Sequence, residues 1–151
     1  MAPRRIWAKK GSKPIFYYQG EHIRCNALGA VCPSSGDFTA LLMPRADTEI
    51  FQMFLDYLNK EIKDKKICLV MDNASWHKAE TLNWGNITPI YLPPYSPDFN
   101  PIEELWKVIK DRLFDIYPSR TFEQHFDKLQ DVMRQLFNNK NEVKSICKLN
   151  Y

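Results

Sequence analysis

A continuous apolar run at positions 67–71 constrains the fold more than any other feature of the sequence. The run, ICLVM, has the length of a strand, and an acid, Asp72, follows it at once. Apolar runs of this kind are typical of strands buried in the middle of a sheet that helices cover. The sequence therefore predicts an α/β layer arrangement with Asp72 at the carboxyl edge of a strand, where such folds place their ligands.

Local patterns predict the remaining elements. Further strands are expected at 14–18, 22–32, 38–43 and 88–92, with a turn at 34–36 that makes the second and third a hairpin. Helices are expected after a cap at Asp47, over 78–83, from Pro101 behind a cap at Asn100, and from a capping box of Thr121 and Gln124. Together they predict a mixed sheet with flanking helices, and the length of 151 residues suits one domain, 1–151.

Bulk properties exclude several classes of protein. There is no run of eighteen apolar residues and no secretory signal, so we expect no membrane segment and a cytoplasmic protein, with the chromosome as a second location. The four cysteines lack zinc-site spacing and are expected to be free thiols. Net charge is +3, and basic residues gather before the first acid, including Arg4, Arg5, Lys9 and Lys10. That basic run suits phosphate contact, and it equally suits a solvated terminus.

Two acids are candidates for chemistry, and each has a plainer explanation. Asp72 either reaches into a ligand crevice or starts a turn. Glu103 stands three residues after Asn100, where it could close a capping box. However, the stretch LPPYSPDFNP before it holds four prolines in ten residues, and such a rigid loop suits a carboxylate that must be held in place. Its neighbour Glu104 is the weaker candidate.

The chemistry that these acids suit is metal-assisted. Carboxylates from separate elements can converge on Mg²⁺, and two such ions can drive displacement at a phosphodiester. A pair of ions normally needs a third carboxylate between them, and the sequence offers no obvious one. His77, five residues after Asp72, could contact a phosphate, orient a ligand or simply be packed. Trp106 is expected in the core, and Tyr95 in the proline loop is a candidate for contact with DNA.

The strings VMDNASWH and LPPYSPDFNPIEELW resemble the mariner-like superfamily of DDE transposases, and most closely the bacterial insertion-sequence group named IS six-thirty. That group shares the motifs D-N-A-x-x-H and Y-S-P-x-x-N-P-I-E-x-x-W. The resemblance implies a ribonuclease H-like fold and DNA strand cleavage and transfer. It also implies two aspartates and a third acid that bind Mg²⁺ or Mn²⁺. The second aspartate would be Asp72 and the third acid Glu103, with thirty residues between them. The candidates for DNA contact are then His77, Asn73, Tyr95, Arg4, Arg5, Lys9 and Lys10.

The chain departs from the family pattern at the first aspartate. In the family that residue lies on a strand before the segment that is here Trp7 to Gly11, and no acid precedes Trp7. Asp37 and Asp47 fall in a hairpin turn and at a helix start, so neither replaces it. We therefore expect the first, central strand of the sheet to be missing and the isolated chain to be marginally stable.

The absence of the first aspartate has more than one explanation. The chain could be a remnant, or the downstream part of a two-frame gene whose upstream product supplies the first aspartate and a helix-turn-helix. Alternatives of another class are an inactive DNA-binding or dimerisation module, with a homodimer as its form, and a nuclease acting on other nucleic acids. The partner that the resemblance implies is DNA, at the transposon ends and the target.

Overall fold

The computed structural model describes residues 25–43, 45–63, 65–94, 96, 99–113, 119 and 121–148. Their order is two strands, a helix, two strands separated by a short 3-10 helix, and three helices. No helix among these residues has the length and apolar content that crossing a membrane requires. The predicted strand at 14–18 and the basic residues Arg4, Arg5, Lys9 and Lys10 lie outside the described residues.

The first two strands form the predicted hairpin. Strand β1 (Asn26–Cys32) pairs antiparallel with β2 (Asp37–Met43), in a register that sets Cys32 opposite Asp37. The turn at 33–36 ends in Gly36, whose φ of 74° lies in the region that favours glycine, and its N–H donates to the Cys32 carbonyl at 2.8 Å. A side chain at Gly36 would also meet the backbone of Lys140, so both the turn and the neighbouring helix require glycine there.

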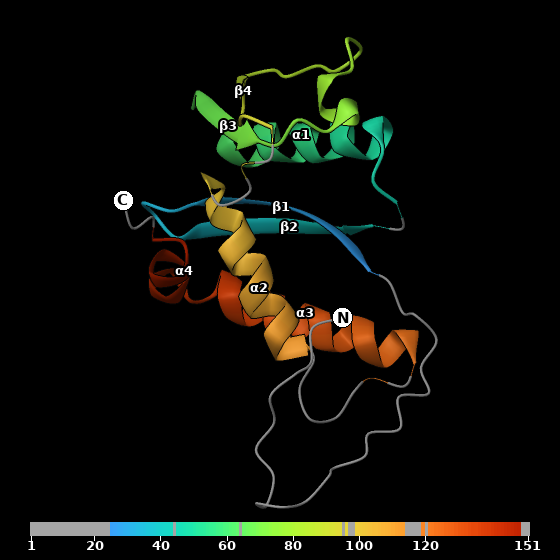
Figure 1. Cartoon of the computed structure of the whole chain (residues 1–151), viewed down its shortest axis with the longest axis vertical. Coiled ribbons are helices and arrows are strands. Elements are labelled where there is room, and N and C mark those ends of the chain that lie inside the picture. Colours follow the sequence, from blue (N-terminus) through green and yellow to red (C-terminus); the bar gives the residue numbers. More distant parts are fainter. Residues whose placement is uncertain are drawn as a thin grey trace, which may run out of the picture.

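Three helices cover one face of the hairpin (Figure 1). They are α2 (Pro101–Leu113), α3 (Phe122–Phe137) and α4 (Lys140–Ile146). Their buried side chains form one hydrophobic cluster with the hairpin residues that point toward them: Leu105, Ile109, Leu113, Leu129, Val132, Met133, Leu136, Val143 and Cys147, with Ala27, Val31, Phe38, Ala40 and Leu42. A fully buried Leu or Val stabilises the fold by about 1.5–3 kcal/mol, so this cluster fixes the helices on the hairpin.

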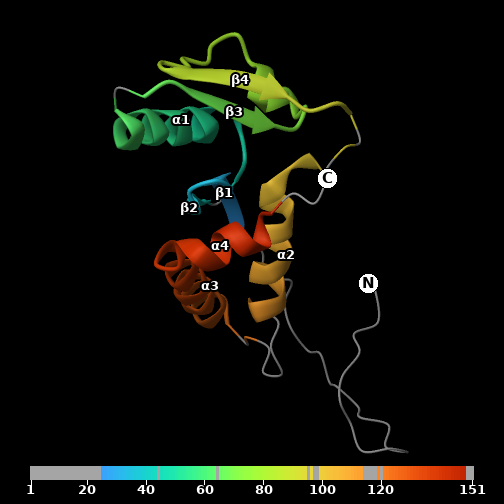
Figure 2. The same cartoon turned by 90° about the vertical axis from the view of Figure 1, so that its left-hand side faces the viewer.

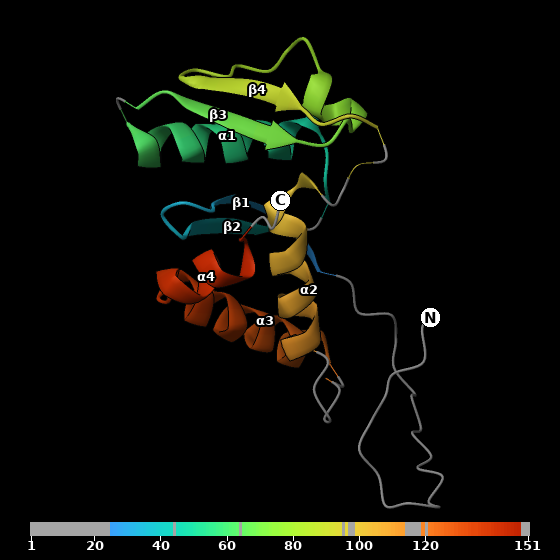
Figure 3. The same ribbon diagram turned by 60° about the vertical axis from the view of Figure 1, so that its left-hand side comes forward.

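Helix α1 (Thr48–Ile62) covers the other face of the hairpin, and strands β3 (Ile67–Met71) and β4 (Ile87–Tyr91) lie beyond it. Figures 2 and 3 show this order of layers: β3–β4, then α1, then the hairpin, then α2 to α4. A second hydrophobic cluster joins α1 to both of its neighbours: Phe51, Phe54, Leu55, Leu58, Met71, Leu82 and Ile87, with Leu28, Ala30 and Leu41 of the hairpin packed against it. Helix α1 is therefore buried on two sides.

The sheet differs from the one that the sequence predicts. The α/β class with flanking helices is confirmed, but the strands described here form two separate two-stranded sheets, β1–β2 antiparallel and β3–β4 parallel. Strand β3 begins and ends where predicted, yet it is not buried in the middle of a sheet. Val70 of β3 is 41% exposed and Ile90 of β4 is 44% exposed, because within the described residues nothing covers the outer face of this pair.

Two local predictions also need correction. The helix expected over 78–83 is instead the 3-10 helix η1 (Ser75–Lys78), because the chain turns directly after Asp72 and is extended again at Ala79. The helix from Thr121 is not the last one, since α4 follows it behind its own cap, Asn139. The expected free cysteines are confirmed: no disulfide joins the four thiols, all of which lie in the described residues.

Candidate functional site

A cavity of about 220 Å³ lies at the carboxyl end of β3, and it brings together the two acids that the sequence singled out. Its walls come from the end of β3, the proline-rich connection after β4 and the first turn of α2. The lining residues are Asp72, Asn73, Leu92, Pro93, Pro94, Ser96, Asn100 and Glu103. The cavity therefore joins residues that lie up to 31 positions apart in the sequence, from Asp72 to Glu103.

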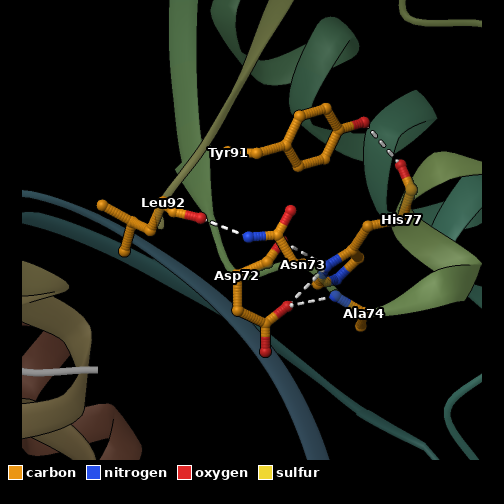
Figure 4. A network of polar contacts seen from close by, with 6 residues as sticks. All are labelled: Asp72, Asn73, Ala74, His77, Tyr91 and Leu92. Carbon is orange, nitrogen blue, oxygen red and sulfur yellow. Dashed lines mark hydrogen bonds and ion pairs between the residues drawn. The ribbon is translucent and has the colours of Figure 1, made fainter. Parts of the chain in front are cut away.

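Asp72 follows the last residue of β3 and turns the chain away from the sheet (Figure 4). Its Oδ1 accepts a hydrogen bond from the Ala74 N–H at 3.1 Å and lies 2.8 Å from Nδ1 of His77. The side chain of Asp72 is nevertheless 72% exposed. Asp72 thus makes the turn that the plainer explanation required, and it also presents its carboxylate at the cavity.

Asn73 ties the far wall of the cavity to the end of β3. Its side-chain N–H donates to the Leu92 carbonyl (Figure 4). The Leu92 N–H in turn donates to the Met71 carbonyl at 2.8 Å. These two bonds fix the start of the proline-rich connection against β3 in the direction of Asp72. The predicted DNA contact of Asn73 stays a prediction, and the amide has this structural task in addition.

Glu103 lies in the first turn of α2, which begins at Pro101 as expected. The Glu103 N–H donates to the Asn100 carbonyl at 3.0 Å, and the Asn100 side chain accepts from the Ile102 N–H at a long 3.4 Å. A carboxylate near a helix N-terminus is favoured by the helix dipole. Glu104, in contrast, forms an ion pair with Lys107 and is absent from the lining of the cavity.

His77 is buried beside the cavity and does not line it. Its ring packs against both Phe51 and Trp76, with centroids 4.6 and 3.8 Å away, and those two rings also contact each other. Burial lowers the pKa of His77, and the neighbouring Asp72 carboxylate opposes that shift. The Tyr91 hydroxyl donates to the His77 carbonyl at 2.8 Å, which holds η1 against β4. The predicted contact of His77 with DNA stays a prediction, and the buried ring has this packing role in addition.

The other candidate residues fall into two groups. Tyr95, Arg4, Arg5, Lys9 and Lys10 lie outside the described residues, so their predicted contacts with DNA stay predictions. Trp106 contacts Phe38 edge-on at 6.1 Å and packs with the hydrophobic cluster of α2 to α4, which agrees with the expected place in the core. Ser96 and Asn100 also line the cavity, which the sequence did not predict, although both lie in the proline-rich stretch before Glu103.

The donor set of the cavity suits a hard divalent cation. Asp72 and Glu103 offer carboxylate oxygens, and Asn100 and Ser96 add amide and hydroxyl oxygens, which are the ligand types that Mg²⁺ and Mn²⁺ prefer. No group of three or more His, Cys, Asp or Glu side chains that could hold a metal occurs within the described ranges. The cavity therefore offers two carboxylates of the type that such an ion binds, and a pair of ions would need a further one.

Comparisons with known proteins show which family the chain resembles. The family described as "DDE superfamily endonuclease" matches residues 1–125. An uncharacterized protein, y4pE/y4sA, of Sinorhizobium fredii is 39% identical over 85 residues, which are 55% of this chain and 63% of that protein. The "Insertion element IS630 uncharacterized 39 kDa protein" of Shigella sonnei is 27% identical over 113 residues, which are 71% of this chain and 33% of that protein.

The matched stretches thus span less than two thirds of the length of either relative. The predicted resemblance to the insertion-sequence group is confirmed by the family match and by the insertion-element relative. Because the match covers more than four fifths of its residues, the chain belongs to the DDE superfamily endonucleases.

Proposed function

We propose that the chain is the catalytic part of a transposase that cuts and joins DNA at the ends of an insertion sequence with the help of a divalent metal ion. The observation that carries the proposal is the single cavity that Asp72 and Glu103 share. The two acids belong to the two separate motifs that resemble the family, and their convergence is what metal-assisted phosphodiester chemistry requires.

Asp72 and Glu103 would hold Mg²⁺ or Mn²⁺, and Asn100 or Ser96 could supply a further oxygen. When bound, such an ion supplies charge that favours attack of a water or a 3′-hydroxyl on the phosphodiester and departure of the leaving oxygen. The residues of the chain have a positioning task. The bonds of Asn73 and Leu92 hold the proline-rich wall against β3, and Pro101 and Asn100 fix the first turn that carries Glu103.

We further propose that the complete fold is ribonuclease H-like, with an additional strand that pairs with the described sheets. Within the described residues, β1 and β3 each have one paired edge and one open edge. Parallel sheets are almost always buried on both faces, whereas β3–β4 has exposed apolar side chains on one face. A strand that pairs with the open edge of β1 or of β3 and ends in an acid would supply the third carboxylate.

That third carboxylate separates two forms of the proposal. If it comes from residues outside the described part or from a partner chain, the cavity is one portion of a working site. If nothing supplies it, the chain keeps the fold and binds DNA or a second copy without cutting. The lining residues of the cavity include two acids, and an assay of DNA nicking decides between the two forms.

The test is metal binding by the full chain, followed by its action on DNA. Mn²⁺ binding is measured from the loss of the free-ion EPR signal, for the parent chain and for Asp72→Asn, Glu103→Gln and Glu104→Gln. We expect the first two variants to weaken binding by at least about tenfold, since each removes one of two charged ligands. Glu104→Gln is the matched control and should bind like the parent, because Glu104 does not line the cavity.

Binding that is unchanged in both cavity variants would refute the proposed site. Plasmid nicking then separates the two forms of the proposal. Metal-dependent nicking that Asp72→Asn abolishes supports a site that is complete in the assay, whereas metal-independent DNA binding without nicking supports the inactive module.

A further inference from the structure

His77 is the buried polar side chain nearest to the proposed site, and its role is open. It is 8% exposed, and no other polar or charged residue among the described ones is classed as buried. It does not line the cavity, so it touches neither a metal ion nor DNA bound there. Any part that it plays must pass through a neighbour, and the polar neighbour that its ring contacts is Asp72.

The two carboxylate oxygens of Asp72 have different surroundings. Oδ1 lies 2.8 Å from Nδ1 of His77 and also accepts the Ala74 N–H at 3.1 Å. Since a carboxylate only accepts, Nδ1 of His77 must carry the proton in this contact. Oδ2 has no hydrogen-bond partner among the described residues. One oxygen is thus held by two donors, and the other is left for a ligand.

The ring of His77 is itself prevented from turning. Phe51 and Trp76 pack on it at 4.6 and 3.8 Å, and Phe51 belongs to the hydrophobic cluster on α1. Nδ1 of His77 also lies 3.4 Å from the Asp72 carbonyl oxygen. The same nitrogen therefore contacts both the side chain and the backbone of Asp72. A donor held in this way costs little entropy to keep aligned, and it fixes the carboxylate rotamer in turn.

We infer that His77 is a positioning residue, which holds Oδ1 of Asp72 so that Oδ2 is presented to a divalent cation in the cavity. This inference rests on the proposed function, because it assigns Asp72 as a ligand. Partners that hydrogen-bond to a ligating carboxylate orient it, and their loss typically lowers metal affinity about 10- to 100-fold. The role differs from that of a ligand or a general base, and the burial of the ring accounts for the difference.

Two substitutions separate positioning from packing. His77→Asn keeps an N–H donor near the place of Nδ1 and loses the ring. His77→Phe keeps a ring packed against Phe51 and Trp76 and loses the donor. Mn²⁺ affinity is measured by EPR on the full chain, and urea unfolding followed by circular dichroism is measured on the same samples, which also shows that each variant is folded.

The positioning role predicts a crossover. His77→Phe should weaken Mn²⁺ binding by about 10-fold or more while its unfolding midpoint stays close to that of the parent. His77→Asn should bind Mn²⁺ within about threefold of the parent while its unfolding midpoint falls, since it leaves space beside the aromatic rings.

Each other outcome overturns a definite statement. If the Phe variant binds Mn²⁺ like the parent, or if both variants lose affinity in proportion to stability, His77 acts by packing and the inference is wrong. If the parent and Asp72→Asn bind Mn²⁺ equally weakly, the proposed metal site is wrong and this inference falls with it. The two failures are distinguishable, because in the first the parent still binds Mn²⁺ more tightly than Asp72→Asn, whereas in the second it does not.

Discussion

Gly29 of β1 lies so close to Trp106 of α2 that Gly29→Ala should destabilise the parent chain, yet stabilise a variant that lacks the Trp106 ring. A methyl group at Gly29 would lie 2.8 and 2.9 Å from two carbons of the Trp106 ring, and 3.2 Å from Cδ1 of Ile102. Contacts below 3.0 Å require a shift, and the Trp106 ring also packs edge-on against Phe38 of the same hairpin face. Since Trp106 stands one helical turn after Glu103, the shift would also move the acid of the cavity.

The expected magnitude follows from two opposing terms. Overpacking a well-packed contact costs about 1–3 kcal/mol. Replacing glycine by alanine gains about 0.4–1 kcal/mol where the backbone allows it, and the φ of Gly29 is not positive. Gly29→Ala should therefore lower the free energy of unfolding by about 1–2 kcal/mol. In a Trp106→Leu background the ring carbons are gone, so the same change should raise the free energy of unfolding by about 0.5 kcal/mol.

The assay is urea unfolding of the parent, both single variants and the double variant, followed by far-ultraviolet circular dichroism because one variant lacks a tryptophan. The coupling between the two positions should reach about 1–3 kcal/mol. An equal effect of Gly29→Ala in both backgrounds would show that the close approach of β1 and α2 does not set the packing. A stabilising effect in the parent would refute the reasoning outright.

Three further outcomes are expected. The Asp47 side chain accepts the Ile50 N–H at 3.0 Å and caps α1. Thermal melts should therefore show that Asp47→Ala lowers the free energy of unfolding by about 1 kcal/mol and that Asp47→Asn lowers it by less. Burial lowers the pKa of His77, so the unfolded chain binds the extra proton more readily. The contribution of His77 to the free energy of unfolding should then be fully present above about pH 7 and fall as the pH drops through about 6.5. Urea unfolding at a series of pH values should show a smaller loss for His77→Asn. Iodoacetamide at about pH 8 should modify Cys32 faster than Cys147 by more than about 100-fold in mass spectra. Hydrogen bonds from neighbouring serines lower the pKa of the exposed Cys32, whereas burial, followed by a nearby carboxylate, raises the pKa of Cys147 to about 11.

The parts of the fold that local chemistry decides were predictable from the sequence. The Asp47 and Thr121 side chains accept backbone N–H groups three residues later, and the helices begin where these caps predict. Pro101 opens α2 because its missing N–H costs nothing in a first turn. The bounds of β3 were also predicted, since a short apolar run between polar segments has few other solutions.

Features that depend on distant parts of the chain were not predictable in this way. The apolar run of β3 indicated burial on both faces, but burial requires a cover that the described residues do not provide, so Val70 is exposed. The short helix α4 was not predicted, because its cap Asn139 follows the end of α3 almost directly. The shared cavity of Asp72 and Glu103 was implied by the family resemblance, whereas the bond from Asn73 to Leu92 is a tertiary contact with no local pattern.

The two acids of the cavity are attached to elements that pack in different hydrophobic clusters, so several contacts are needed to hold the acids together. Asp72 follows Met71, which is buried with α1, while Glu103 shares its helix with Leu105, which is buried with α3 and α4. The clusters meet across the hairpin, and the chain between the acids crosses from one to the other through the proline-rich stretch. A sub-ångström slip between the clusters would move one acid relative to the other. The bonds at Leu92, the prolines and the Gly29 contact each restrict that slip, so the geometry of the site is a property of how the layers are joined.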